Sequence, residues 1–195
     1  MKKIAVVVEG PSDKVFWEKV LNREFAPQIL FKVMSKNGRS KVVESAPFFL
    51  DACRRGGYAG IFFLVDLDDT PCVAAVRELF DGRLLVKAPE DSAFFIHICV
   101  AKKEFEAWLL ADEEAIREVL PNAGYVGHEF TDELGAERKL KELLHLDRGA
   151  GAGFRKPGFA REVAPYFIAA RAMARSHSFT YFWNKVTAAV AGLAP

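Results

Sequence analysis

The chain has 195 residues, of which 51% are hydrophobic, so its length and composition suit one compact domain or a core with an added helical lobe. Its 27 basic and 26 acidic residues leave a formal net charge of +1. Because the charges nearly cancel, bulk electrostatics do not indicate a nucleic-acid partner, and binding to a polyanion would depend on a local basic patch or a metal ion. Three scattered cysteines exclude a disulfide framework, and no stretch is apolar enough to cross a membrane, so we expect a cytoplasmic protein.

The first half of the chain alternates predicted strands with predicted helices. Apolar runs rich in β-branched and aromatic residues predict strands at residues 4–8, 29–34, 61–65 and 94–100. Between them we predict helices that are capped by Ser12 or Asp13, by Ser40, and by Thr70 before Pro71. This alternation is typical of an α/β fold in which helices cover both faces of a parallel sheet.

The second half is predicted to be mainly helical. Residues 104–120 indicate one helix or a broken pair, residues 136–146 an amphipathic helix, and residues 159–193 further helix rich in alanine and aromatics. A basic, glycine-rich loop spans residues 148–158. We therefore divide the chain into an α/β core, residues 1–111, and a helical C-terminal extension that packs on it, residues 112–195.

Two of the predicted strands end in acidic residues. The first ends in Glu9-Gly10, and the third ends in Asp66-Leu67-Asp68-Asp69. In an open parallel sheet, ligands bind beyond the carboxyl ends of the strands, so these carboxylates meet at one edge if both strands are central. The alternative is that they only cap the next helices, but Ser12 or Asp13 is better placed than Glu9, and Thr70 already precedes Pro71.

Carboxylates that converge at strand ends repel one another, and their pKa values rise unless a cation intervenes. A hard divalent cation such as Mg²⁺ or Mn²⁺ prefers oxygen ligands and is therefore the expected cofactor. The chain has no G-x-G-x-x-G after the first strand and no Walker lysine, so backbone amides are not expected to cradle a phosphate. A phosphate would reach the acidic edge through a metal, which favours chemistry on phosphates or phosphodiesters.

Residues 6–13 resemble the first motif of TOPRIM domains, a strand ending in Glu-Gly, and residues 63–68 resemble the second, a strand ending in Asp-x-Asp. That superfamily includes topoisomerase, primase and OLD-type nuclease domains, and the resemblance implies a Rossmann-like TOPRIM fold. Residues 101–112 are also similar to the signature of a bacterial family of unknown function, DUF4276, as are residues 155–157 and 178–179 more loosely. That family is grouped with TOPRIM domains and lies near phage-defence genes.

The resemblance implies roles for individual acids. Glu9 would be a general acid/base or a metal ligand, and Asp66 and Asp68 would hold Mg²⁺. Glu106 would add a ligand, although Glu104 and Glu106 lie about 200° apart on a helix, so only one of them faces the site. The alternative for both is a solvent-exposed, acidic helix start. Asp69 follows Asp68 directly, where many TOPRIM domains place another residue before a third acid, so its role stays open.

The candidate substrate-binding residues are Gly10, Asp13, Lys36, Arg39 and Lys156. The three basic ones would hold a nucleic-acid backbone, the alternative being that they are solvated loop charges. Aromatic residues near the C-terminus could stack on bases, or serve packing or a dimer: Phe179, Tyr181, Phe182 and Trp183.

The leading hypothesis is a metal-dependent nuclease that hydrolyses phosphodiester bonds of nucleic acid, in phage defence, as a homodimer or with a partner protein. A phosphatase of the haloacid-dehalogenase type is an alternative, because Asp66, Asp68 and Thr70 also form a D-x-D-x-T motif. A second alternative is a non-catalytic sensor subunit that binds a metal or a nucleotide.

Overall fold

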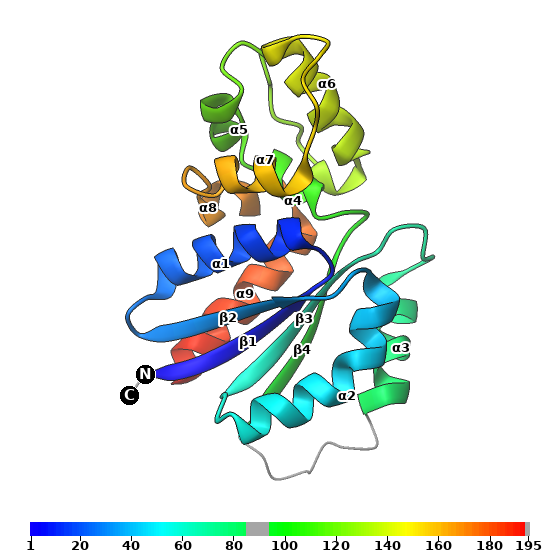
Figure 1. Cartoon of the computed structure of the whole chain (residues 1–195), viewed down its shortest axis with the longest axis vertical. Helices are drawn as coiled ribbons and strands as arrows, with labels where there is room; N and C mark the ends of the chain where they lie inside the picture. Colours follow the sequence, from blue (N-terminus) through cyan, green and yellow to red (C-terminus); the bar gives the residue numbers. More distant parts are fainter. Residues whose placement is uncertain (85–93, 194–195) are drawn as a thin grey trace.

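A four-stranded parallel sheet lies at the centre of the computed structural model, which describes residues 1–84 and 94–193 (Figure 1). The sheet has the order β2-β1-β3-β4. Its strands are β1 (Lys2–Val8), β2 (Ile29–Ser35), β3 (Gly60–Asp66) and β4 (Phe95–Ala101). The chain moves outward from β1 to β2 and, on the other side, from β3 to β4. The sheet order therefore reverses between β1 and β3, and such a switch point opens a crevice at the carboxyl ends of these strands.

Alternate residues of β1 face two separate hydrophobic cores, as the two-residue period of a strand requires. Ile4 and Val6 belong to the core under α1 (Pro11–Phe25), whereas Ala5 and Val7 belong to the core under α2 (Arg39–Arg55) and α3 (Val73–Leu84). Figure 1 shows α2 and α3 together on one face, with α1 and α9 on the other. The predicted parallel sheet covered on both faces is confirmed.

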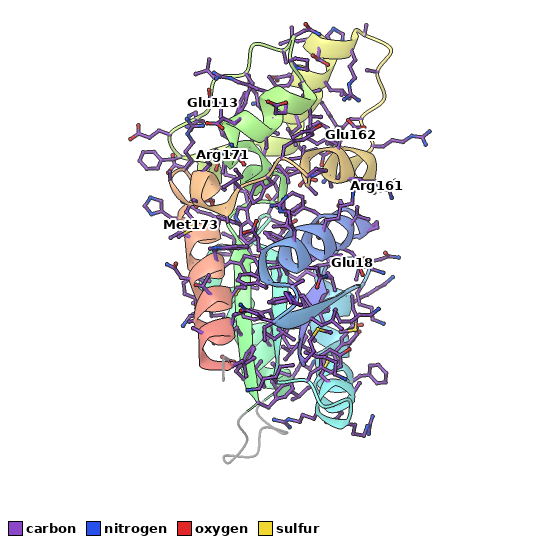
Figure 2. All side chains as sticks on the ribbon, turned by 90° about the vertical axis from the view of Figure 1, so that its left-hand side faces the viewer. Glu18, Glu113, Arg161, Glu162, Arg171 and Met173 are labelled. Carbon is purple, nitrogen blue, oxygen red and sulfur yellow. The ribbon has the colours of Figure 1, made fainter. Side chains whose placement is uncertain are left out.

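Beyond β4 the described chain is helical, as predicted. It contains α4 (Glu106–Ala111), α5 (Glu113–Val119), η1 (Thr131–Glu133), α6 (Ala136–Arg148), α7 (Lys156–Val163), α8 (Ala169–Met173) and α9 (His177–Leu193). Helices α4 to α8 form a lobe beyond the carboxyl edge of the sheet, where Figure 2 labels Glu113 and Arg171, while α9 runs back along β4. Among residues 1–84 and 94–193, no helix has both the length and the apolar character that a membrane span requires.

Three helices of the sheet layers begin at other residues than predicted. Helix α3 begins at Val73 because Thr70 donates its backbone N–H to Leu67 O, at 3.0 Å, and closes a turn before the helix. Helix α1 begins at Pro11, with Gly10 as N-cap, and α2 at Arg39, after Gly38 with a φ of 95°. Proline at the first position of α1 suits its missing N–H, and glycine before α2 tolerates the positive φ.

The predicted helix over residues 104–120 is a broken pair because Asp112 interrupts it. The Asp112 carboxylate accepts a hydrogen bond from Ala115 N at 3.2 Å and thereby caps α5. It also accepts one from Ile168 N at 2.6 Å and contacts the guanidinium of Arg171. Asp112 is fully buried, so these bonds replace the water that it loses. One acidic side chain therefore joins the start of α5 to the segment before α8.

Helix α9 is fixed to the sheet layer by an aromatic cluster. The ring of Phe182 lies 4.9 Å from that of Trp17 and 5.3 Å from that of Trp108, measured between centroids. Phe179 also stacks within this cluster and is fully buried, whereas Tyr181 is 41% exposed. The packing interpretation of the C-terminal aromatics therefore applies to Phe179 and Phe182 but not to Tyr181.

Replacing Phe182 with alanine should lower the free energy of unfolding by about 3–5 kcal/mol, because it removes a fully buried ring that joins α9 to α1 and α4. Urea denaturation followed by circular dichroism measures this loss. Phe48→Ala on α2 is the control, since Phe48 is 64% exposed and should cost less than about 1 kcal/mol. Equal losses in the two variants would contradict the packing described for α9.

Candidate functional site

The ends of β1 and β3 and the start of α4 open onto a cleft of about 430 Å³. Its lining brings together the residues that directly follow β1 with residues from α1, β3, α4 and α7. Among them are four carboxylates and an amine: Glu9, Asp13, Asp66, Glu106 and Lys156. Gly10 lies in the same lining. We call this space the acidic cleft.

Glu9 and Asp66 meet at the switch point of the sheet. The Glu9 Oε1 atom accepts a hydrogen bond from the backbone nitrogen of Asp66 at 2.8 Å. Burial raises the pKa of Glu9, although this hydrogen bond acts in the opposite direction. Burial also raises the pKa of Asp66 well above its usual range, and the nearby carboxylates of Asp13, Glu9 and Glu106 add to the effect.

Asp13 belongs to the same group of acids, although the sequence indicated only a helix cap or a substrate contact. It lies in the first turn of α1, where its Oδ2 atom accepts a hydrogen bond from Gly10 N at 2.9 Å. Burial raises its pKa to about 7, with the charges of Glu106 and Glu9 contributing. The sequence could have indicated this role, because Asp13 lies in the first turn of a helix that follows β1 directly. Such a turn stays at the carboxyl edge of the sheet, where Glu9 also lies.

Glu106 lines the acidic cleft and pairs with Lys156. The Nζ atom of Lys156 lies 2.9 Å from Glu106 Oε1 and 2.7 Å from Glu137 Oε2. Glu106 is 3% exposed, and this burial raises its pKa, although Lys156 opposes the rise. Glu104 is directed to α6 instead, where its Oε1 atom accepts a hydrogen bond from Glu137 N at 2.8 Å. Of the two glutamates that the sequence left open, Glu106 is thus the one at the cleft.

Asp68 lies outside the lining of the acidic cleft. Its backbone adopts a φ of 46°, its amide donates to Lys103 O at 2.8 Å, and about half of its side chain is exposed. Its Oδ2 atom is 3.8 Å from the guanidinium of Arg39. Its charge still contributes to raising the pKa values of Glu9 and Asp66, so Asp68 lies beside the acidic cleft without lining it.

Two predicted substrate-binding cations also lie outside this lining. The Arg39 guanidinium donates to the carbonyl oxygens of Asp66 and Leu67, each at 2.9 Å, and so holds the loop after β3 in place. The Nζ atom of Lys36 lies 5.3 Å from the centroid of the Phe49 ring. The structure therefore gives Arg39 a positioning contact beside the cleft. Substrate binding by Arg39 and Lys36 stays a prediction.

The carboxylates of the acidic cleft fit a hard divalent cation by chemistry, because they offer oxygen donors only. Within the part of the chain that the structure describes, no three histidine, cysteine or acidic side chains stand close enough together to hold an ion. Binding would therefore require the carboxylates of Glu9, Asp13 and Asp66 to turn toward the ion. Glu106 would also have to break its ion pair with Lys156 to contact the ion. Metal binding by Glu9, Asp66, Asp68 and Glu106 stays a prediction.

The fold and the cleft define an α/β protein with buried acids at the switch point of a parallel sheet. The chain belongs to the family described as "Domain of unknown function (DUF4276)", whose profile matches residues 8–187 and thus every candidate residue named above. A search among curated proteins gave no match. Among solved structures, the C-terminal region of the Burkholderia pseudomallei OLD protein has a similar fold, with a TM-score of 0.51 over 98% of each chain at 18% sequence identity.

The raised pKa of Asp13 predicts that the metal-free protein becomes less stable as pH rises. The ordinary pKa of the group is 3.8 and the folded value is about 7, so the folded state keeps a proton that the unfolded chain releases in this range. The stabilisation is complete below pH 3.8 and is lost as pH rises through 7. Urea denaturation in EDTA between pH 4 and 8 should show this decline, with a weaker slope in Asp13→Asn. The control Asp81→Asn, an exposed residue of α3, should keep the wild-type slope.

Lys156→Met should destabilise the protein, because it leaves the buried carboxylate of Glu106 without its cation. We expect a loss of about 1–2 kcal/mol, below the range for fully buried pairs because Lys156 is partly exposed. The double variant Lys156→Met, Glu106→Gln should regain most of this loss in urea denaturation. Lys139→Met is the matched control, since Lys139 forms an exposed pair with Glu142 on α6. A double variant no more stable than Lys156→Met would contradict this account.

Proposed function

We propose that the chain is a TOPRIM-type nuclease that uses Mg²⁺ or Mn²⁺ to hydrolyse phosphodiester bonds of nucleic acid in the acidic cleft. The observation that carries this proposal is the convergence of Glu9, Asp13, Asp66 and Glu106 at the switch point between β1 and β3. Ligands of open parallel sheets bind at such a point.

The electrostatics of the acidic cleft support a cation as part of the working protein. Burial and mutual repulsion raise the pKa values of the cleft acids, which shows that their charged forms are poorly stabilised by the chain alone. Groups with strongly shifted pKa values inside a cleft are typical of functional sites. A divalent cation would compensate several of these charges at once and would draw the acids into their ionised forms.

The chemistry divides between the cation and the side chains. A bound divalent cation supplies Lewis-acid stabilisation of a phosphoryl oxygen and lowers the pKa of water. Glu9 has a raised pKa beside the open cleft, which suits a group that accepts a proton from the attacking water. Lys156 places an ammonium group at the same lining, where it would attract a phosphate oxygen. Arg39 fixes the backbone of Asp66 and thereby the direction of its carboxylate.

The similarities to known proteins support a nuclease. The two motifs resemble those of the TOPRIM superfamily, which includes OLD-type nuclease domains, and the fold of the chain is similar to the C-terminal region of an OLD protein. A role in phage defence, with a second copy or a partner protein, is part of the same proposal. The phosphatase alternative has less support, because Asp68, its proton donor, lies outside the acidic cleft.

Cleavage assays test the proposal directly. Labelled single- and double-stranded DNA and RNA are incubated with the protein and Mg²⁺, Mn²⁺ or EDTA. We expect metal-dependent cleavage, with rates at least about 100-fold lower in Glu9→Gln and Asp66→Asn. Glu18→Gln, which changes an exposed acid on α1, is the control and should cleave like the wild type (Figure 2).

Thermal unfolding gives a readout that does not depend on cleavage. Mg²⁺ or Mn²⁺ at about 100 times its dissociation constant should stabilise the wild type by about 2.7 kcal/mol and leave Asp66→Asn nearly unchanged. Metal binding without cleavage of any nucleic acid would contradict the nuclease proposal and favour the sensor alternative. A phosphate trapped covalently on Asp66 would favour the phosphatase alternative.

A further inference from the structure

A second cleft, of about 540 Å³, lies at the β4 side of the same edge of the sheet. Its walls come from four parts of the chain that are distant in sequence. Arg77 of α3 forms one wall, Lys102 after β4 another, and Phe130 and the first turns of α9, with His177 and Tyr181, close the rest. We call it the basic aromatic cleft.

The floor of this cleft is built from buried, fully paired polar groups. The Ser178 hydroxyl donates to Asp132 Oδ1 at 2.7 Å and accepts from the indole N–H of Trp108 at 2.7 Å. Asp132 is buried and also accepts hydrogen bonds from Ser178 N and from the Ser176 hydroxyl. These bonds fix the start of α9 against α4 and η1, so the cleft is a preformed feature of the fold.

Two large aromatic rings stand exposed at this cleft instead of packing into the core. Phe130 is 42% exposed and Tyr181 is 41% exposed, while Phe182 beside it is fully buried. Arg77 donates to the Tyr181 hydroxyl at 2.8 Å, and its guanidinium lies 5.4 Å from the centroid of that ring. The Nζ atom of Lys185 also lies 5.6 Å from this centroid. Tyr181 is therefore held in place with part of its ring open to solvent, and a base that stacks on it would share the ring with these cations.

The basic side chains of this cleft differ in how closely a carboxylate approaches them. Arg77 contacts a tyrosine hydroxyl, and neither it nor His177 forms an ion pair among the described residues. Lys102 reaches Glu133 at 4.0 Å, an exposed pair near the limit of contact. Of the four basic side chains in the lining, Arg175 alone has a close carboxylate partner, Glu113. The same lining also contains the carboxylates of Asp132 and Glu133, so a phosphate would be drawn chiefly to Arg77, which has no ion-pair partner among the described residues.

The two clefts are neighbours along one edge. In the sheet register Asp66 of the acidic cleft pairs with Ala101, and Lys102 of the basic aromatic cleft is the next residue. The loops after β3 and β4 are also joined, since Asp68 N donates to Lys103 O at 2.8 Å. A nucleic-acid strand held at the acidic cleft can therefore continue over this short boundary.

We propose that the basic aromatic cleft binds single-stranded nucleic acid beside the bond that is cleaved. An unpaired base stacks on Tyr181 and Phe130, and a phosphate contacts Arg77 and Lys102. The proposal rests on the function proposed above and assigns its substrate class, because a base inside a duplex has no free face to offer to these rings.

Fluorescence anisotropy of labelled single-stranded oligonucleotides tests this, in EDTA so that no cleavage occurs. Tyr181→Ala should weaken binding by about 5- to 150-fold, and Tyr181→Phe, which keeps the ring, should retain it. Arg77→Gln should weaken binding and reduce the slope of log affinity against log salt by about 0.7. Tyr166→Ala, at an exposed tyrosine outside this cleft, and Arg161→Gln on α7 (Figure 2) are the matched controls and should bind like the wild type. Urea midpoints of all variants identify any that fail to fold.

The outcomes separate the two proposals. If Tyr181→Ala and Arg77→Gln bind single strands as the wild type does, while Asp66→Asn abolishes cleavage, the basic aromatic cleft is not the substrate site and the nuclease proposal stands. If the cleft variants lose single-strand binding but no metal supports cleavage, binding is established and the nuclease proposal fails.

Equal loss of single-strand and duplex binding would overturn the assigned preference for single strands. Altered self-association in Tyr181→Ala, with oligonucleotide binding intact, would assign the cleft to a protein interface and overturn the proposal.

Discussion

The hydrogen bond from the Asp66 backbone nitrogen to the Glu9 carboxylate joins the ends of two central strands at the point where the sheet reverses its order. It places two acidic groups side by side at the acidic cleft, and the start of α1 brings Asp13 to the same lining. Burial then raises the pKa values of all three acids. The chain tolerates this repulsion at a site where a bound cation would relieve it, as functional sites often do.

Helix α4 joins the acidic edge of the sheet to the other helices of the lobe. Its first residue, Glu106, reaches Lys156 of α7, and its third, Trp108, donates to Ser178 of α9. The segments that resemble the family signature, at residues 101–112, 155–157 and 178–179, therefore meet around one short helix. Without the lobe the acidic cleft would lose both Glu106 and Lys156, so the sheet alone does not complete the site.

The two clefts separate charge within a chain that is nearly neutral overall. Acids gather at the ends of β1 and β3, while most of the basic side chains and exposed rings of the second cleft gather beyond β4. Under the proposals above, a cation would bridge the phosphates of a ligand to the acids, and Arg77 with the exposed rings would contact the rest of it.

The sequence by itself determined the alternation of strands and helices and the presence of Glu9 and Asp66 at strand ends, because periodicity and strand termination are local properties of the chain. Tertiary structure alone decided that Asp13 joins the acids, that Asp68 lies outside the cleft lining, and that Glu106 pairs with Lys156, 50 residues further along. It also decided that Phe182 packs while its neighbour Tyr181 stays exposed. These outcomes depend on which face of each helix meets a distant segment, and no local pattern records that choice.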